Sequence, residues 1–322
     1  MTGERDWEPT ATLAALRLRA RLLTRTREFF AQRGVLEVET PILGSSTATD
    51  PHIESVPCSV GGSRRFLQTS PELFMKRLLA AGSGPIYQLS KVFRDGESGS
   101  RHSPEFTLLE WYRPGLDHHG LMDEVDELLQ EVLGCGASVR ETYAAAFERE
   151  VGIDPHRASA CDLSTRAEAR GLVAASSRTF SREDWLHLLM AEVVEPRLGS
   201  ARPHFLYDFP RELSALARVR KGERGAADVA ERFEVYFRGL ELANGYHELT
   251  DASEQRERFL ADLESRSALG RALPPIDERM IAALAHGLPP CAGVALGFDR
   301  LVMIAADAKS IDAVLSFSSE RA

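Results

Sequence analysis

Two runs of strand-like sequence, residues 86–93 and 105–112, flank a polar loop that is rich in glycine and serine. Both runs are rich in β-branched and aromatic side chains, and such runs on either side of a polar loop predict a pair of antiparallel strands. The strand signal returns at residues 232–249 and again from residue 293, with helices expected between the runs. Strands and helices that occur in separated runs predict an α+β fold, in which helices flank an antiparallel β-sheet.

Helical periodicity is clearest in two segments that precede or lie between the strands. Residues 13–32 carry apolar side chains near helical spacing, and Gly34 is expected to end this helix. Residues 71–79 predict a second helix, with Ser70 as its N-cap and Pro71 at its first position.

The middle of the chain, from about residue 141 to 230, is richer in Ala, Arg and Glu and weaker in strand signal than the rest. We therefore expect one domain over residues 1–322 that carries a mostly helical insertion at about 141–230.

Composition excludes several classes of protein. The net charge of -9 argues against broad attraction to a nucleic-acid backbone, which depends on clustered Lys and Arg. No apolar run approaches the roughly 20 residues of a membrane-spanning helix, and residues 1–10 lack the pattern of a secretory signal. The four cysteines are too sparse for a disulfide framework or a cysteine-based zinc site. We expect a cytoplasmic protein that does not enter a membrane.

The loop between the first two strands carries charges in a pattern that suits a polyphosphate. Arg94 stands at the end of one strand, and Arg101 and His102 lie on the return of the loop. A guanidinium held at a strand end forks onto one phosphate while mobile cations close over the others. Phe106 offers an aromatic face to a purine. On spacing alone, an ordinary hairpin with a charged loop is an equal alternative.

Two further pairs of side chains are candidates for binding charge. Strand alternation places Glu110 and Tyr112 on one face, where a carboxylate beside a phenol can hold an ammonium group. A surface-facing pair is an alternative of at least equal weight. Near the C-terminus, glycines at 293 and 297 allow a ligand to approach the backbone, and Arg300 is expected in the first turn of the helix that follows.

The dipeptide Asn244-Gly245 is a strong hairpin signal between alternating residues. A two-residue turn there would place Glu241 opposite Glu248, with their Cβ atoms about 5 Å apart. A Mg²⁺ ion that carries nucleotide phosphates would offset the repulsion between the two carboxylates. If the strand instead bulges at Gly245 and continues, this pairing fails. Two solvated glutamates on an edge are a further alternative.

Together these features resemble, in order and spacing, the three signature motifs of class II aminoacyl-tRNA synthetases. Motif one resembles the helix at 13–32 with residues 34–41, motif two the hairpin at 94–106, and motif three residues 293–300. The lysyl branch of the class is the most similar. The segments that carry this similarity are 71–73, 106–112 and 241–249.

Lysyl-tRNA synthetases carry an N-terminal anticodon-binding barrel, whereas motif one begins almost at the start of this sequence. The chain therefore looks like the short paralogues that form the elongation factor P–(R)-β-lysine ligase family. This resemblance implies ATP and Mg²⁺ as cofactors, an amino acid as substrate and elongation factor P as acceptor. It also implies a homodimer formed through the motif-one region and no anticodon-binding domain, hence no recognition of a tRNA anticodon.

The roles of the family's residues carry over by position. Arg94 would hold the α-phosphate and the substrate carboxylate, Phe106 and Arg300 would sandwich the adenine, and Arg94 and Arg300 would stabilise charge during catalysis. Glu241 and Glu248 would hold Mg²⁺. The implied amino-acid pocket consists of Ser70, Pro71, Glu72, Glu110, Tyr112, Glu248 and Ala295. The implied ATP contacts are Arg94, Asp95, Gly96, Glu97, His102, Ser103, Phe106, Glu241, Leu242, Gly297 and Arg300.

The sequence departs from the family pattern in the motif-two loop. Gly96 stands where the family usually has glutamate, with Glu97 one position later, and Ser103 stands where asparagine is usual. We expect Glu97 to supply the missing carboxylate and a glutamate at position 96 to be tolerated. Two alternatives stay open: a truncated synthetase that charges a tRNA or a small amine, and a non-catalytic regulatory paralogue. The residues do not separate α-lysine from β-lysine.

Overall fold

The structure is a computed structural model that describes residues 7–172, 180–223 and 225–322. Residues 1–6 lie outside the described part, so the expectation about an N-terminal signal falls partly outside it as well. The chain forms two compact units. The first consists of Met1–Leu116, Glu131–Leu133 and Thr250–Ala322, and the second of Asp117–Gln130 and Gly134–Leu249.

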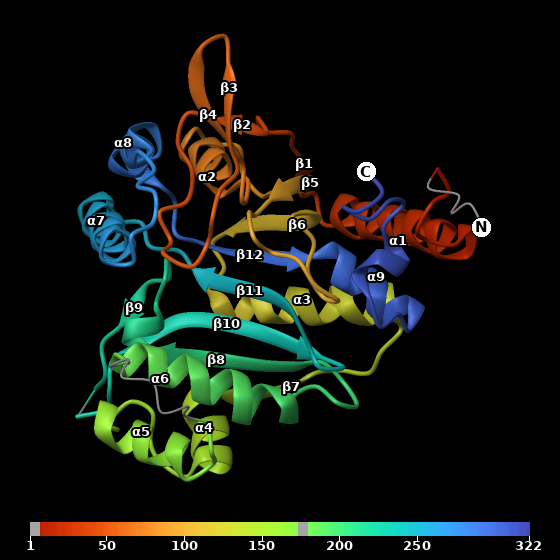
Figure 1. Ribbon diagram of the computed structural model, residues 1–322. Coiled ribbons are helices and arrows are strands. Elements are labelled where there is room, and N and C mark those ends of the chain that lie inside the picture. Colours follow the sequence, from red (N-terminus) through yellow and green to blue (C-terminus); the bar gives the residue numbers. More distant parts are fainter. Residues whose placement is uncertain (1–6, 173–179, 224) are drawn as a thin grey trace. The chain divides into compact units, whose positions relative to one another are not determined.

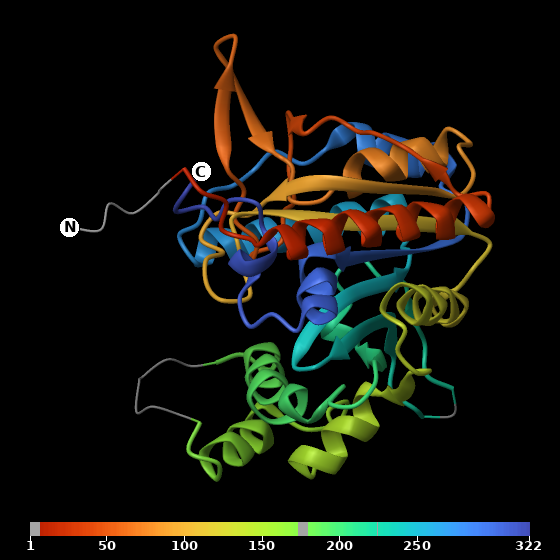
Figure 2. The same cartoon turned by 90° about the vertical axis from the view of Figure 1, so that its right-hand side faces the viewer.

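The first unit contains the predicted antiparallel strands. Strand β5 (Ile86–Phe93) pairs with β6 (Glu105–Pro114), and β6 pairs with β12 (Cys291–Gly297), both in antiparallel fashion. Strand β1 (Leu36–Glu37) is two residues long and pairs with β5 in parallel. Three short strands form a separate small sheet that projects from this unit (Figures 1 and 2): β2 (Leu43–Gly44), β4 (Ser63–Leu67) and β3 (Pro57–Val60).

Helices cover the sheet of the first unit. The predicted helix at 13–32 is present as α1 (Leu13–Gln32), and Phe30 on it stacks on Tyr87 of β5 at 4.3 Å and meets Trp111 of β6 edge-on at 5.3 Å. Figure 2 shows α1 running alongside these two strands. The other helical segments of this unit are α2 (Glu72–Ala80), α7 (Ala252–Ala268), α8 (Glu278–Gly287), α9 (Phe298–Ala306) and the 3₁₀ turn η4 (Ile311–Val314).

Helix α2 begins one residue later than predicted. Pro71 is its N-cap, in place of Ser70, and makes no capping hydrogen bond through its side chain. The Ser70 hydroxyl nevertheless accepts a hydrogen bond from the Glu72 amide at 3.0 Å. Ser70 therefore still satisfies one of the amide groups that a helix leaves unpaired at its start.

Asp299 at the start of α9 contacts both β6 and α1 in the first unit. Its buried carboxylate accepts a hydrogen bond from the Thr107 amide of β6 at 2.6 Å and pairs with Arg19 of α1. Arg19 also donates to the Thr107 hydroxyl at 2.7 Å. Because charge-assisted bonds in a buried setting hold their geometry strongly, the N-terminal turn of α9 is fixed against β6.

The strands of the second unit form a mixed, mostly antiparallel arrangement. Strands β11 (Leu240–His247), β10 (Val229–Phe237) and β8 (His204–Pro210) are antiparallel neighbours, and β7 (Val139–Thr142) is parallel to β8. The short strand β9 (Val219–Arg220) pairs with β10. The helical segments are α3 (His118–Leu133), α4 (Tyr143–Val151), α5 (Ala160–Glu168), α6 (Arg182–Leu189), a π-helical turn η1 (Met190–Val194) and two 3₁₀ turns, η2 (Glu195–Arg197) and η3 (Arg211–Leu213).

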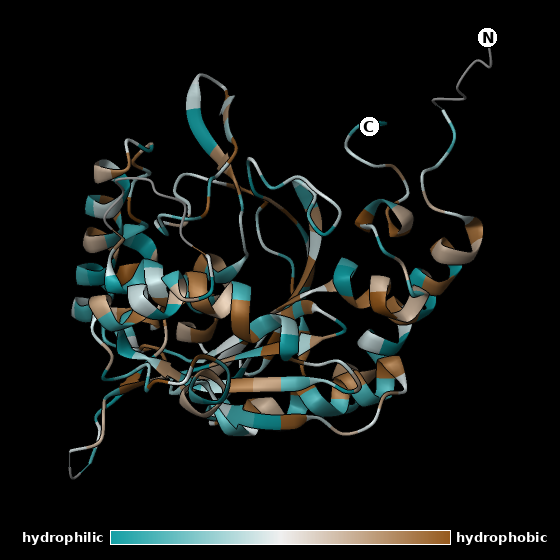
Figure 3. Cartoon of the chain, turned by 60° about the horizontal axis from the view of Figure 1, so that its bottom comes forward, coloured by the Kyte–Doolittle hydropathy of each residue, from teal (hydrophilic) through white to brown (hydrophobic). Residues whose placement is uncertain are grey.

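The helical character expected for residues 141–230 holds only for the earlier part of that segment. Helices α4 to α6 pack on an apolar core, whose largest members include Tyr143, Phe147 and Phe209. From His204 onward the chain returns to strands. Residues 173–179 and 224 of this segment lie outside the described part. Figure 3 shows that apolar residues (brown) and polar residues (teal) occur together along the helices of the chain, as expected for elements with one buried side. The single-domain description stays a prediction.

The hairpin predicted at Asn244-Gly245 is wrong. Strand β11 runs through both residues, and Asn244 pairs with Glu234 of β10. The reversal lies at Arg238 and Gly239, whose φ angles of 51° and 74° match the two positive values that a type I′ turn requires. The register of β10 and β11 shifts between Val235 and Tyr236, so the alternative of a bulge at Gly245 is wrong too. No helix in the described ranges is long and apolar enough to span a membrane.

Candidate functional site

The motif-two loop of the first unit holds Arg94 in a defined position. The Arg94 amide donates to the Pro104 carbonyl at 2.9 Å, which closes the loop behind strands β5 and β6. Its guanidinium lies 5.1 Å from the centre of the Phe106 ring and 3.4 Å from a carboxylate oxygen of Glu97. The Arg94 Nε atom is buried and has no hydrogen-bond partner among the described residues. A buried donor of this kind is costly unless a ligand satisfies it.

The returning part of the loop brings His102 to Arg300. Gly99 and His102 exchange backbone hydrogen bonds of 3.2 Å, and the His102 ring lies 2.7 Å from the Arg300 guanidinium. Partial desolvation, followed by the positive charge of Arg300, lowers the pKa of His102. Arg300 occupies the first turn of α9, as the sequence predicts. The Arg300 guanidinium gives this side of the loop a fixed positive charge, which suits a phosphate.

Gly297 precedes α9 at the end of β12. A Cβ atom at this position would meet the Arg300 side chain no closer than 3.6 Å, which is an ordinary contact. Packing in the chain itself therefore does not require glycine here. Space beside a strand-to-helix junction is consistent with close approach of a ligand. Of the other loop residues that the family resemblance predicts as ATP contacts, Asp95 and Gly96 are exposed and Ser103 is buried.

A buried carboxylate forms the second part of the site in this unit. Ser70 donates to Glu110 at 2.6 Å and Tyr112 donates to its other oxygen at 2.8 Å. Glu110 is only 2% exposed, so the alternative of a surface-facing pair is wrong. Ala295 on β12 lies directly opposite Glu110 in the sheet register. The structure thus brings four residues of the expected amino-acid pocket together.

The expected pocket residue Glu72 has a partner that the sequence reasoning missed. Lys76, one helical turn later on α2, pairs with Glu72 at 2.6 Å and has a side chain that is 0% exposed. Oppositely charged residues four positions apart on a helix often form ion pairs, although ion pairs with a buried lysine are rarer. Glu72 and Glu110 together carry two negative charges against the single charge of Lys76. Acidic side chains thus predominate in this group, which suits an ammonium group.

The remaining expected residues belong to the second unit. Glu241 lies opposite Tyr236 in the register of β10 and β11, and Leu242 next to it is 2% exposed. Burial, followed by the charges of Glu234 and Glu241, raises the pKa of Tyr236 well above its ordinary value.

Glu248 follows β11 and is 2% exposed, so the alternative of a solvated glutamate is wrong for this residue. The sequence reasoning also missed the neighbouring ion pair between Arg232 and Glu234 of β10. The expected roles of Glu241 and Glu248 toward Mg²⁺ stay predictions.

Known proteins resemble this chain over nearly its whole length. The family model of class II tRNA synthetases (D, K and N) matches residues 6–321. A relative from Vibrio cholerae named elongation factor P–(R)-β-lysine ligase is 50% identical over 323 residues, which cover 98% of this chain and 99% of the relative. Relatives with the same name from Hamiltonella defensa and Edwardsiella ictaluri are 47% and 48% identical, with 100% of both chains covered. The chain belongs to this ligase family.

Membership of the elongation factor P–(R)-β-lysine ligase family confirms two expectations from the sequence. The α+β fold of a class II synthetase domain is present, with a mixed and mostly antiparallel arrangement of strands. The enzyme class, a ligase of the class II synthetase type, is confirmed as well.

Proposed function

We propose that this chain uses ATP to activate (R)-β-lysine, or lysine, as an aminoacyl-adenylate and transfers it to a lysine side chain of elongation factor P. The observation that carries the proposal is the match, over nearly the whole of both chains, to relatives named for that reaction. In the first step a carboxylate oxygen of the amino acid attacks the α-phosphorus of ATP and pyrophosphate leaves. In the second the acceptor amine attacks the acyl carbon and AMP leaves.

The group around Glu110 supports the choice of a cationic amino acid. Its carboxylate is desolvated and already accepts hydrogen bonds from Ser70 and Tyr112. The neighbouring Glu72 shares its charge with Lys76. An ammonium group of the substrate would find in Glu110 and Glu72 two acidic acceptors held by neighbouring hydrogen bonds and an ion pair.

The motif-two loop supports the binding of ATP. The unsatisfied Nε of Arg94 is available for a phosphate oxygen, and Phe106 and Arg300 offer a ring and a planar guanidinium to the adenine. Since the reaction needs no nucleophile from the protein, catalysis would come from in-line positioning and charge stabilisation. Glu241 and Glu248 are the proposed Mg²⁺ ligands, and the ion would neutralise charge on the phosphates.

Homodimer formation through the motif-one region is part of the proposal. Large apolar side chains are exposed in this region of the first unit and directly after it, among them Leu36 at 56% and Ile42 at 43%. Exposed apolar side chains that lie close together in a chain are typical of an interaction surface. Leu36→Glu should shift the purified protein from dimer to monomer in light scattering after size exclusion. A monomeric wild-type protein would remove this part of the proposal.

The central experiment offers the purified protein ATP, Mg²⁺ and (R)-β-lysine together with either elongation factor P or bulk tRNA. Intact mass spectrometry should detect one added lysyl group on elongation factor P, with release of AMP, and tRNA should stay uncharged. Arg94→Ala should abolish the modification, whereas Arg166→Ala on the exposed side of α5 should not. Charging of tRNA without modification of the protein acceptor would favour the truncated-synthetase alternative, and no adenylate formation at all would favour the regulatory one.

Pyrophosphate exchange with a panel of amino acids tests the pocket separately from the acceptor. Norleucine has nearly the shape of lysine without the distal ammonium, so it should support exchange at a small fraction of the rate with lysine or (R)-β-lysine. A rate close to that with lysine would mean that the pocket does not select a second ammonium. The ratio of the rates with (R)-β-lysine and lysine would identify the preferred substrate.

A further inference from the structure

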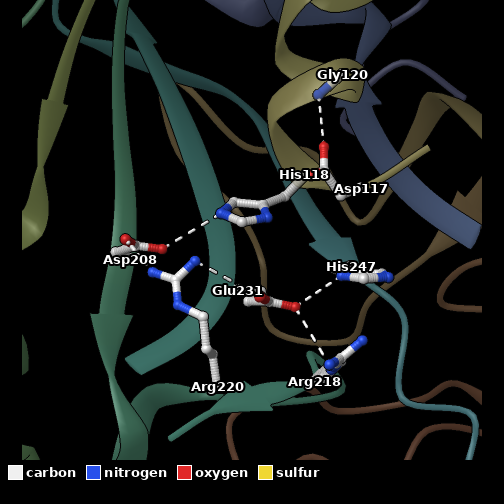
Figure 4. A network of polar contacts seen from close by, with 8 residues as sticks. All are labelled: Asp117, His118, Gly120, Asp208, Arg218, Arg220, Glu231 and His247. Carbon is white, nitrogen blue, oxygen red and sulfur yellow. Dashed lines mark hydrogen bonds and ion pairs between the residues drawn. The ribbon is translucent and has the colours of Figure 1, made fainter. Parts of the chain in front are cut away.

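Three side chains from distant parts of the sequence meet in the second unit. His118 is the first residue of α3, Glu231 lies on β10, and His247 is the last residue of β11. One nitrogen or oxygen atom from each of the three lies within 4.8 Å of the others. Figure 4 shows the three side chains facing one another, with Asp208 on the far side of His118. None of them takes part in the proposed reaction.

The His118 side chain directs a buried nitrogen atom toward the other two residues. Its side chain is 1% exposed, and its Nε2 atom lies 3.3 Å from a carboxylate oxygen of Asp208. A carboxylate accepts a hydrogen bond from that nitrogen, so in the singly protonated ring the lone pair lies on Nδ1. The Nδ1 atom is buried and has no hydrogen-bond partner among the described residues. A buried acceptor without a partner is costly to the fold, and it points toward Glu231 and His247 (Figure 4).

The charges around the group favour a cation. Glu231 lies 2.6 Å from Nδ1 of His247, and its nearest guanidiniums, those of Arg218 and Arg220, stand at 3.7 and 3.6 Å. Both arginine side chains are about half exposed, so water screens their electrostatic attraction to the Glu231 carboxylate. The carboxylates of Asp208 and Glu231 each contact one of the two histidines directly.

We propose that His118 Nδ1, Glu231 and His247 bind a zinc ion. Two imidazoles and one carboxylate are a common donor set for zinc, with water in the fourth position. Donor atoms around tetrahedral zinc are roughly 3.3 Å apart, so the present separations, all within 4.8 Å, would have to close by at most about 1.5 Å. Asp208 supports His118 from behind, in the manner of a carboxylate that orients a zinc-bound histidine. The ion would join the start of α3 to strands β10 and β11 and so stabilise the second unit.

The test uses the full chain after treatment with a chelator and dialysis. Isothermal titration with zinc chloride should give one tight site per chain, and zinc should raise the melting temperature because the ion binds only the folded protein. Cobalt, used as a spectroscopic substitute, should produce the visible absorption of a low-coordinate nitrogen and oxygen site. His118→Gln and His247→Gln should each abolish the tight site. Asp208→Asn should weaken binding by about 10–100-fold.

His119→Gln is the matched control, because this histidine is adjacent to His118 in the chain but outside the three-residue group. It should bind zinc as tightly as the wild type. Circular dichroism without metal checks that each variant is folded, and Asp208→Asn, which keeps every ligand, decides the matter if both histidine variants fail to fold. The proposal would be overturned if the wild type bound zinc only weakly. It would also be overturned if the wild type, Asp208→Asn and the folded ligand variants bound zinc equally well, which would indicate an adventitious ion only.

Discussion

The Ser70 hydroxyl lies 2.6 Å from the Glu110 carboxylate, although 40 positions separate the two residues in the chain. The bond joins the start of α2 to the centre of β6, and the Tyr112 phenol occupies the other carboxylate oxygen. The carboxylate is thereby held in one orientation before any substrate arrives. Such preorganisation reduces the entropy that binding has to offset.

Removing either hydroxyl should therefore weaken binding of the amino acid more than binding of ATP. We expect Ser70→Ala and Tyr112→Phe each to cost about 1–3 kcal/mol in kcat/KM for the amino acid, the usual effect of leaving a buried charged acceptor short of a donor. Steady-state pyrophosphate exchange with each substrate varied measures this. Tyr143→Phe, which alters a buried tyrosine in the core of the second unit, is the control and should leave both constants unchanged. An equal rise in the KM for ATP would mean that the two hydroxyls act on the whole site.

The ion pair between Lys76 and Glu72 should matter for stability because it is buried. Lys76→Met leaves Glu72 without its partner in a poorly solvated position, which typically costs about 3–5 kcal/mol. Lys91→Met is the matched control: Lys91 pairs with Glu105 at 3.3 Å, but both side chains are about half exposed. That change should cost at most about 1 kcal/mol. Urea unfolding of the three proteins compares them, and similar losses in the two variants would show that burial of Lys76 contributes nothing.

The lowered pKa of His102 predicts a dependence of stability on pH. The folded protein keeps His102 neutral to lower pH than the unfolded chain does, so the unfolded chain binds the extra proton first. This contribution to stability is present above the ordinary histidine pKa and is lost as pH falls through the lowered value. His102→Gln should thus lose less free energy of unfolding than the wild type as pH falls below about 6.5. Parallel curves of stability against pH for the two proteins would contradict the assignment.

Gly96 should not tolerate the glutamate that the family carries at this position, contrary to the expectation from the sequence. Its φ angle is 78°, a value that residues with a Cβ atom adopt at a cost of about 1–2 kcal/mol. Gly96→Ala and Gly96→Glu should both be destabilised by about that amount. Gly136→Ala should be nearly neutral, since that glycine lacks a positive φ and has open space around it. Thermal unfolding in parallel measures the difference, and an unchanged Gly96→Ala would mean that the loop shifts freely.

Glu97 is expected to take over the role of the missing glutamate, and its position 3.4 Å from Arg94 supports this. Glu97→Ala should weaken the use of ATP by about 1–3 kcal/mol in kcat/KM. Glu97→Gln, which keeps a hydrogen-bonding oxygen, should lie between this variant and the wild type. If Glu97→Ala leaves both constants for ATP unchanged, the site works without that carboxylate. Low activity in the wild type as well would favour the regulatory alternative.

The sequence alone determined the features whose cause is local. Alternation and residue type predicted both ends of β5 and the first residue of β6 correctly. Helical periodicity predicted both ends of α1 correctly. The placement of Arg94 and Arg300 at element ends follows from the same patterns, and the family likeness supplied their expected roles. These features need only neighbouring residues, because backbone preferences and the spacing of apolar side chains act over a few positions.

Only the tertiary structure decided the features that depend on distant partners. Asn244-Gly245 has the stronger turn chemistry, yet the chain reverses at Arg238-Gly239, because that reversal lets Asn244 pair with Glu234 along a full strand. The buried pairing of Lys76 depends likewise on the elements that cover α2. The meeting of His118 with Glu231 and His247 joins residues more than 100 positions apart. No local pattern contains such a contact, since it arises only when separate strands and helices take up one register.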